Sequence, residues 1–116
     1  MPFEISLINN NEFNLGIEEL MRTLEMDPTY KKSLYLVIAL AYKRLVKYDE
    51  AIEILNRGLE KYPDYYDCLV YRGKLHLKKD NFYHALKDFS EAIQVNKAKG
   101  FAYIGKAMCE KELGHL

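Results

Sequence analysis

Among the side chains of this 116-residue chain that could bind a metal or attack a substrate, three histidines and two cysteines come first. His76, His84 and His115 are dispersed, and none has a Cys or carboxylate at the spacing of metal ligands. Cys68 and Cys109 stand far apart and outside any nucleophile motif, which favours reduced thiols in a cytosolic protein over a disulfide. The sequence therefore predicts neither a metal site nor covalent catalysis.

Other sequence patterns that carry chemistry are missing as well. No glycine-rich phosphate loop is present, because the six glycines are scattered through predicted helices and caps. The paired carboxylates Asp49 and Glu50 fall in the first turn of a predicted helix, where the helix dipole accounts for them. We therefore expect no cofactor and no enzyme activity within these 116 residues.

The overall charge excludes further classes of partner. Seventeen basic residues balance seventeen acidic ones, whereas a general nucleic-acid binder normally has a basic excess. The longest apolar run, Leu34 to Tyr42, is too short to span a bilayer, and the N-terminus lacks the pattern of a secretory signal. We expect a soluble cytoplasmic domain without a nucleic-acid or membrane partner.

The element that organises the chain is the stretch from Asp80 to Val95. Its apolar residues fall mostly three and four apart, as on one face of an amphipathic helix. Asp80 and Asn81 offer side-chain oxygens for the first free amides of that helix. A stretch with the same pattern lies thirty-four residues earlier. The positions that correspond between the two stretches are Tyr48 and Phe82, Ala51 and Ala85, Leu55 and Phe89, Gly58 and Ala92, and Leu59 and Ile93.

The repeat extends over most of the chain when units begin at Lys32, Tyr66 and Gly100. A small residue where two helices cross lets the backbones approach, and a ring from the partner helix fills the space beside it. The positions that correspond are Tyr35, Leu69 and Tyr103; Ala39, Gly73 and Ala107; Tyr42, His76 and Glu110; and Val46, Asp80 and Gly114. This pattern predicts an all-α fold with helices over about Phe3 to Asn9, Glu12 to Met26, Tyr30 to Leu45, Asp49 to Lys61, Tyr65 to Lys78, Phe82 to Val95 and Lys99 to Leu113.

These residues resemble the tetratricopeptide repeat family, whose unit is a helix–turn–helix of thirty-four residues; a helical hairpin array of another family is the alternative. The departures are Arg72 and Lys106 at a Leu-like position, His76 and Glu110 at an aromatic position, and Lys97 for proline. The family pattern is matched in one unit by Tyr35, Ile38, Ala39, Tyr42, Ala51, Leu55, Gly58 and Pro63, and in the next by Leu69, Gly73, Ala85, Phe89 and Ala92.

The resemblance implies a right-handed superhelical array of antiparallel helix pairs, an α-solenoid of about three units with incomplete ends. Its units would be 1–31 in part, 32–65, 66–99, and 100–116 as a first helix only. The last helix would then lack the partner against which Tyr103 and Ala107 pack in a longer array. Either the chain is a piece of such an array, or another copy covers this helix by self-association.

In this family the first helices of successive units line a concave groove that receives a peptide or helix. An apolar anchor could be buried there while lysines attract an acidic segment, although each lysine by itself could simply solvate a helix face. The resemblance places in the groove positions two, five, nine and twelve or thirteen of each unit, with Tyr71 added at position six of the second. These residues are Ser33, Leu36, Leu40, Lys43, Asp67, Val70, Tyr71, Lys74, Lys78, Phe101, Ile104, Met108 and Lys111.

The predicted function is a non-catalytic scaffold that binds a peptide or helix of a partner protein, somewhat acidic and with an apolar anchor. Two alternatives stay open, namely a regulatory repeat segment of a larger enzyme and a chaperone-binding adaptor. Co-chaperones of this family hold the terminal carboxylate of heat-shock chaperones with Lys and Asn, but Leu36, Leu40 and Val70 occupy such positions here. Only Lys74 is suitably basic, so a standard clamp is not expected.

Overall fold

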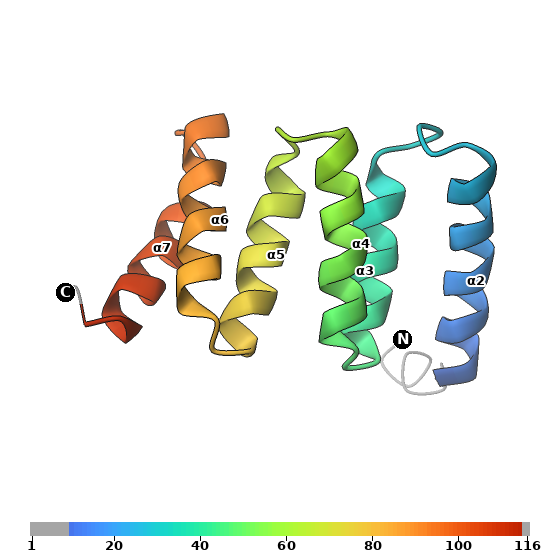
Figure 1. The fold of residues 1–116 in the computed structure, drawn as a ribbon, viewed down its shortest axis with the longest axis horizontal. Coiled ribbons are helices and arrows are strands. Elements are labelled where there is room, and N and C mark those ends of the chain that lie inside the picture. The colour runs from blue at the N-terminus through green and yellow to red at the C-terminus, as the bar shows by residue number, and fades with distance from the viewer. Residues whose placement is uncertain (1–9, 115–116) are drawn as a thin grey trace, which may run out of the picture. The chain divides into compact units, whose positions relative to one another are not determined.

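The computed structural model describes residues 10–114, and over that range it is built of six helices and no strands (Figure 1). The predicted all-α fold is confirmed. The predicted helix over Phe3 to Asn9 lies outside the described residues. The helices are α2 (Asn10–Met26), α3 (Ser33–Arg44), α4 (Tyr48–Lys61), α5 (Tyr66–Lys78), α6 (Phe82–Val95) and α7 (Phe101–Glu112).

Most helix ends lie within two residues of their predicted places, and α3 is the exception because it begins three residues late. The delay has a local cause in the turn before it. The Asp27 carboxylate accepts hydrogen bonds from the Thr29 amide at 3.1 Å and from the Thr29 hydroxyl at 3.0 Å. Such an Asx turn competes with the helix for the backbone, so Tyr30 stays in the loop.

The turn between α5 and α6 differs from its prediction. Neither Asp80 nor Asn81 caps α6 with its side chain, since the Asn81 N-cap makes no side-chain hydrogen bond. Both residues instead close α5: the Asp80 amide donates to Leu77 O at 3.0 Å, and the Asn81 amide donates to His76 O at 2.8 Å. With a φ of 59° at Asp80, this is a Schellman motif, in which the left-handed residue ends the helix.

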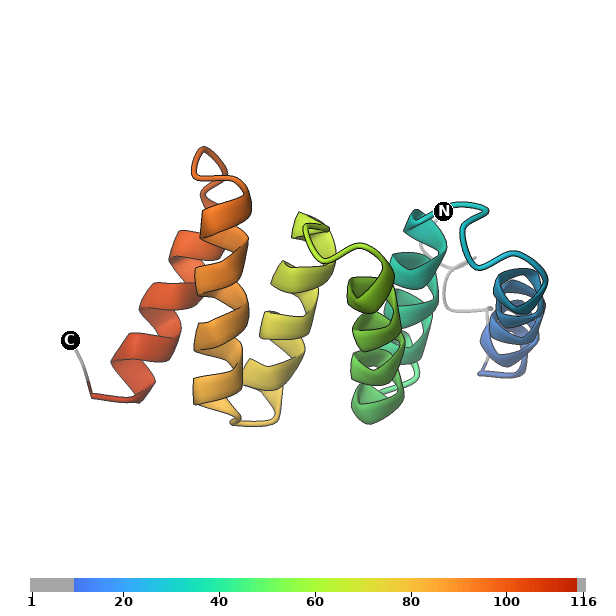
Figure 2. The same ribbon diagram turned by 45° about the horizontal axis from the view of Figure 1, so that its top comes forward.

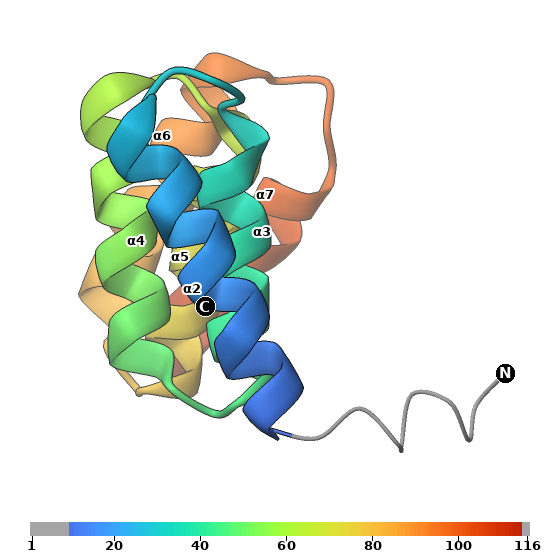
Figure 3. The same ribbon diagram turned by 90° about the vertical axis from the view of Figure 1, so that its right-hand side faces the viewer.

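The chain forms two compact units, Met1–Ile54 and Leu55–Leu116. In the first unit α2 packs against α3, which lies behind α2 in the view of Figure 3. Ile17 and Leu24 of α2 and Tyr35 and Ile38 of α3 are buried. Tyr35 is 1% exposed and therefore belongs to the core, and its hydroxyl donates a hydrogen bond to Pro28 O at 3.0 Å.

In the second unit α6 packs against both α5 and α7, as Figure 2 shows in yellow, orange and red. The fully buried ring of Phe89 lies against a glycine on each side. A Cβ built at Gly73 would come within 2.9 Å of that ring, and one built at Gly105 would come closer still. Only hydrogen at these two positions leaves room for the ring, which is how α5 and α7 can both approach α6.

The packing of α7 corrects one prediction. Tyr103 stands at a repeat position that the family uses for packing and was predicted to lie in the core, but it is 46% exposed. Ala107 is exposed as well, as expected of a helix that lacks the partner against which these two residues would pack. The buried face of α7 instead carries Ala102, Gly105 and Cys109. Among the described helices α7 packs against α6 and α5, and these cover one of its faces. A second helix of its own unit would cover the opposite face.

A buried ion pair explains how arginine can occupy the Leu-like position of α5. The carboxylate of Asp88, which is 2% exposed, accepts from Arg72 Nε at 2.9 Å and from Nη2 at 2.6 Å. Arg72 Nη1 donates to Asn56 Oδ1 at 2.8 Å. Burial opposes the charge on Arg72, but its hydrogen bonds to Asp88 and the charge of that carboxylate raise the Arg72 pKa above its ordinary value.

Candidate functional site

The residues predicted to line a groove are distributed over both units. In the first unit Ser33 is exposed, whereas Leu36, Leu40 and Lys43 are half-buried on α3. In the second unit Asp67 and Tyr71 are half-buried on α5. The exposed members of the set in that unit are Lys74, Lys78, Phe101, Ile104, Met108 and Lys111.

Val70 does not fit the predicted set, because its side chain is only 4% exposed. Helix α5 contacts both α6 and α7, so more of its circumference is covered than the circumference of a helix with one neighbour. Val70 therefore serves the core of the second unit and offers no surface to a ligand.

Three of the predicted residues come together around one ammonium group. Lys74 Nζ lies 5.1 Å from the centroid of the Tyr71 ring and 5.7 Å from the centroid of the Phe101 ring. Tyr71 and Lys74 belong to α5 and Phe101 to α7, so the lysine bridges two helices through cation–π contacts. We call the surface formed by Tyr71, Lys74, Phe101, Ile104, Met108 and Lys111 the α5–α7 surface.

The α5–α7 surface is apolar to an unusual degree for exposed helix positions. Phe101 is 65% exposed, Ile104 is 62% exposed and Met108 is 52% exposed, one turn after another along α7. An exposed apolar strip of this kind is typical of an interaction site and not of an ordinary solvated helix face. Lys74 and Lys111 add positive charge along the same strip, so the surface is both apolar and basic.

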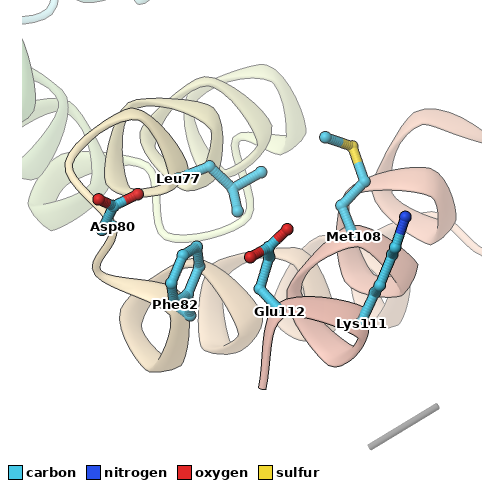
Figure 4. Close-up of a pocket in the computed structure, with 6 residues that line it drawn as sticks. All are labelled: Leu77, Asp80, Phe82, Met108, Lys111 and Glu112. Atoms are coloured by element: carbon cyan, nitrogen blue, oxygen red, sulfur yellow. The ribbon is translucent and has the colours of Figure 1, made fainter. Parts of the chain in front are cut away.

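A cavity of about 320 Å³ lies where α5, α6 and α7 end or begin (Figure 4). The Phe82 ring and the Glu112 carboxylate both point toward Leu77 in the close-up, and Met108 and Lys111 stand on α7 beside them. Apolar side chains thus share the cavity with charged ones. Its lining residues are Leu77, Asp80, Phe82, Met108, Lys111 and Glu112.

Only Met108 and Lys111 of these lining residues were predicted from the sequence. Leu77 could have been found, because it stands at position twelve of its unit, as Lys43 and Lys111 do in theirs. The prediction took Lys78 at position thirteen instead. Phe82 and Asp80 line the cavity through the geometry of the turn between α5 and α6, for which the sequence carried no separate signal.

The reactive side chains lie elsewhere and are packed. The side chains of Cys68 and Cys109 are fully buried, and burial, together with the charge of Glu110, raises the pKa of the Cys109 thiol. Between residues 10 and 114 no group of three or more His, Cys, Asp or Glu side chains could hold a metal ion. In the same range no helix combines the length and the apolar character that crossing a membrane requires.

His76, which stands at the aromatic position of α5, is packed against α6. Its ring centroid lies 5.2 Å from that of His84, and its Nε2 lies 4.0 Å from Asp88 Oδ2. Its Nδ1 is buried and has no hydrogen-bond partner within the described part of the chain. Burial is the main cause that lowers the His76 pKa, helped by the charges of His84, Arg72 and Lys79, while Asp88 opposes the shift.

A family model matches part of the chain in sequence. The family model described as tetratricopeptide repeat matches residues 33–65, which is the unit that carries eight of the pattern residues. The resemblance stated from the sequence is confirmed for this unit.

Solved structures extend the likeness to the fold of most of the chain. A tetratricopeptide repeat protein from Parabacteroides merdae ATCC 43184 matches with a TM-score of 0.80 and 24% identity, over 90% of this chain and 41% of that one. MamA matches with a TM-score of 0.80 and 19% identity, over 90% of this chain and 60% of that one. The chain thus spans about half the length of these two proteins.

A third solved structure includes a ligand. The first tetratricopeptide repeat domain of Spaghetti (RPAP3), bound to the HSP90 peptide SRMEEVD, matches with a TM-score of 0.80 and 20% identity. The match covers 90% of this chain and 82% of that one. At these identities the three structures establish a shared fold.

Proposed function

Because residues 33–65 are a tetratricopeptide repeat in sequence and most of the chain shares the fold of such proteins, we propose that this protein is a non-catalytic protein-interaction module. It binds a peptide or helix of a partner protein on the first helices of its units. The proposal includes the division of the chain into units 32–65 and 66–99 with partial units at 1–31 and 100–116. Left-handed turns at Val46, Asp80 and Gly114 support that division.

The observation that carries the proposal is the position of Lys74 between the rings of Tyr71 and Phe101. The two aromatic faces hold the ammonium group in place and leave Lys74 exposed. A carboxylate of a ligand that reaches Lys74 meets a charge whose side chain is already ordered, so less conformational entropy is lost on binding.

Charges around the α5–α7 surface indicate the orientation in which the ligand binds. The cavity at the end of α7 carries two carboxylates, Asp80 and Glu112, against one ammonium group, Lys111, so its charge balance disfavours an acidic ligand residue there. Its apolar members Leu77, Phe82 and Met108 suit a hydrophobic side chain. The ligand therefore places its acidic end at Lys74 and its apolar anchor in the cavity.

A second candidate is a chaperone-binding adaptor, favoured by the likeness to a domain bound to an HSP90 peptide. That peptide, SRMEEVD, is acidic at its end and carries a methionine, which agrees with the ligand chemistry above. The side chains that would hold it differ from the Lys and Asn expected of a clamp in this family, since Leu36 and Leu40 stand on α3. Lys74 would have to supply most of the basic contact.

Selection of peptides from a random displayed library tests the proposal, followed by titration of the selected sequences by fluorescence anisotropy. We expect sequences that combine Asp or Glu with a Leu, Met or aromatic residue. Lys74→Glu should weaken their binding about tenfold or more, because it replaces an attraction with a repulsion. Phe101→Ser should weaken it as well.

The matched control is Lys97→Glu, which makes the same charge change at an exposed loop position that is not part of the α5–α7 surface. It should leave binding unchanged. Selection of basic peptides, or equal binding by wild type and Lys74→Glu, would contradict the proposal. Titration of SRMEEVD in parallel separates the two candidates: strong binding that depends on Lys74 favours the adaptor.

A further inference from the structure

We call the side of α7 that carries Tyr103, Lys106 and Ala107 its outward face. The corresponding face of α5 has a similar composition and is covered by another helix. On α5 the corresponding face carries Leu69, Arg72 and Gly73, and α6 covers it: Leu69 is 2% exposed and Gly73 touches the Phe89 ring. On α7 the same three positions are Tyr103, Lys106 and Ala107, thirty-four residues later. Tyr103 is 46% exposed and Ala107 is exposed, so this face is accessible.

The contact between α5 and α6 shows what kind of helix fits such a face. Helix α6 presents Ala85 at the crossing, with no exposed surface, and Asp88 three residues later. The Asp88 carboxylate is held by Arg72 at 2.6 Å. A helix that covers α7 in the same way needs a small residue at the crossing and a carboxylate three residues later, opposite Lys106.

Helix α2 carries that pattern on a surface of its own. Gly16 stands where Ala85 stands in α6, Leu20 where Phe89 stands, and Glu19 where Asp88 stands. Gly16 is exposed, and a Cβ built there meets none of the described atoms within 4 Å. Leu15 beside it is 62% exposed. The side chain of Glu19 is 71% exposed, and within α2 its carboxylate accepts from Arg22 Nη1 at 2.7 Å, a surface pair that Lys106 of another copy would join or replace.

We propose that the chain self-associates head to tail, with α2 of a second copy packed on the outward face of α7. Gly16 of the partner subunit lies over the crossing beside Ala107, and Glu19 of the partner subunit pairs with Lys106 as Asp88 pairs with Arg72. The interface joins two different surfaces, so each added copy leaves one free α7 face and one free α2 face. Assembly then grows with concentration instead of stopping at a dimer.

Opposite charges would meet in either case, so the exposed small and apolar residues of α2 are what favour α2 over a second α7 as the occupant. The interface just described matches a carboxylate with an ammonium group at the centre of the contact. A two-fold contact between two α7 helices would instead pair Lys106 with Glu110 of the partner subunit, and it would leave the exposed Leu15 and Gly16 of α2 unused. The two arrangements make opposite predictions for compensating substitutions.

Sedimentation velocity of the full chain over a range of concentrations tests the proposal. We expect a series of species that shifts to larger sizes as concentration rises. Lys106→Glu and Glu19→Lys should each lower the association constant about tenfold, because each places like charges in contact. The chain that carries both substitutions should associate again, since the two charges are then exchanged across the interface and attract each other. An equimolar mixture of the two single variants should form a mixed contact for the same reason.

Controls separate the charge effect from misfolding. Lys97→Glu and Glu25→Lys reverse charges outside the two faces and should associate as wild type does. Circular dichroism should show unchanged helicity for all variants, because every substituted side chain is at least partly exposed. Peptide binding at the α5–α7 surface should survive Lys106→Glu, so failure of either proposal can be recognised separately.

Several outcomes would overturn the proposal. One is a monomer at every concentration, and another is a monomer–dimer equilibrium without larger species. A third is rescue of Lys106→Glu by Glu110→Lys in the same chain and not by Glu19→Lys, which would assign the contact to two α7 helices.

Discussion

Val46 and Asp80 share one backbone conformation: each has a φ of 59°, and they lie thirty-four residues apart at the end of a first helix. In both turns the next amide reaches five residues back, from Lys47 to Tyr42 O at 2.9 Å and from Asn81 to His76 O at 2.8 Å. Gly114 has a φ of 78° at the same place in the following unit. The turn requires the left-handed conformation, whichever residue the sequence supplies.

Val46→Gly should stabilise the protein, because valine is β-branched and disfavoured at positive φ whereas glycine adopts it freely. Val46 is 67% exposed, so few contacts are lost. We expect a gain of about 1 kcal/mol in the free energy of unfolding, measured in urea. Val95→Gly at the end of α6 is the control and should have the opposite sign, and a loss of stability in Val46→Gly would contradict the argument.

Gly105→Ala should destabilise the second unit more than Gly73→Ala. The added Cβ would come within 2.9 Å of the Phe89 ring at Gly73 and closer still at Gly105, and that ring is fully buried. Crowding of this kind costs about 1–3 kcal/mol, against a gain of about 1 kcal/mol from the helix propensity of alanine. Gly16→Ala, where no described atom is near, should show only the gain in thermal unfolding.

Arg72→Ala should cost about 3–5 kcal/mol of stability, since it leaves the Asp88 carboxylate buried without its cation. The double substitution Arg72→Leu with Asp88→Leu should recover most of that loss, because leucine is the type of residue the family places at position 72 and no charge then remains buried. Chemical denaturation of the two variants and wild type measures the difference. A double variant as unstable as Arg72→Ala would mean that the ion pair itself holds α5 to α6.

The sequence predicted the helices and the packing of α5 against α6 well, because both depend on local periodicity and on small residues such as Ala85, which is fully buried. It predicted the face of α7 less well. Gly105 and Ala107 are both small and lie on different sides of the helix, and the choice between them depends on which neighbour is present. The Arg72–Asp88 pair could not be predicted either, since the two residues are sixteen apart and each alone looks like a surface charge.

The same holds for the site. The sequence predicted Tyr71, Lys74 and Phe101 as groove residues. In the structure the Lys74 ammonium group lies over the rings of the other two. The cavity that adjoins them depends on the Schellman turn at Asp80, which places Phe82 near Leu77 and Met108. Turn geometry in three dimensions is not contained in helix periodicity, so Leu77 and Phe82 appeared only with the structure.

Acidification should destabilise the fold through His76, whose pKa lies below its ordinary value of 6.5. At pH values between the lowered pKa and 6.5, His76 binds a proton in the unfolded chain but not in the folded chain. The free energy of unfolding therefore falls as the pH falls. The stabilising contribution is complete above about pH 6.5. Protonation would place a cation near Arg72, Lys79 and His84, although Asp88 lies on the same side.

Urea denaturation at about pH 8 and at about pH 5.5 measures this effect. His76→Phe, which supplies the aromatic residue that the family pattern has at this position, should reduce the difference between the two pH values. His84→Gln removes an exposed histidine and should keep most of the difference. Stability that is unchanged or greater at the lower pH in the wild type, or a full pH dependence in His76→Phe, would assign the proton uptake to another group.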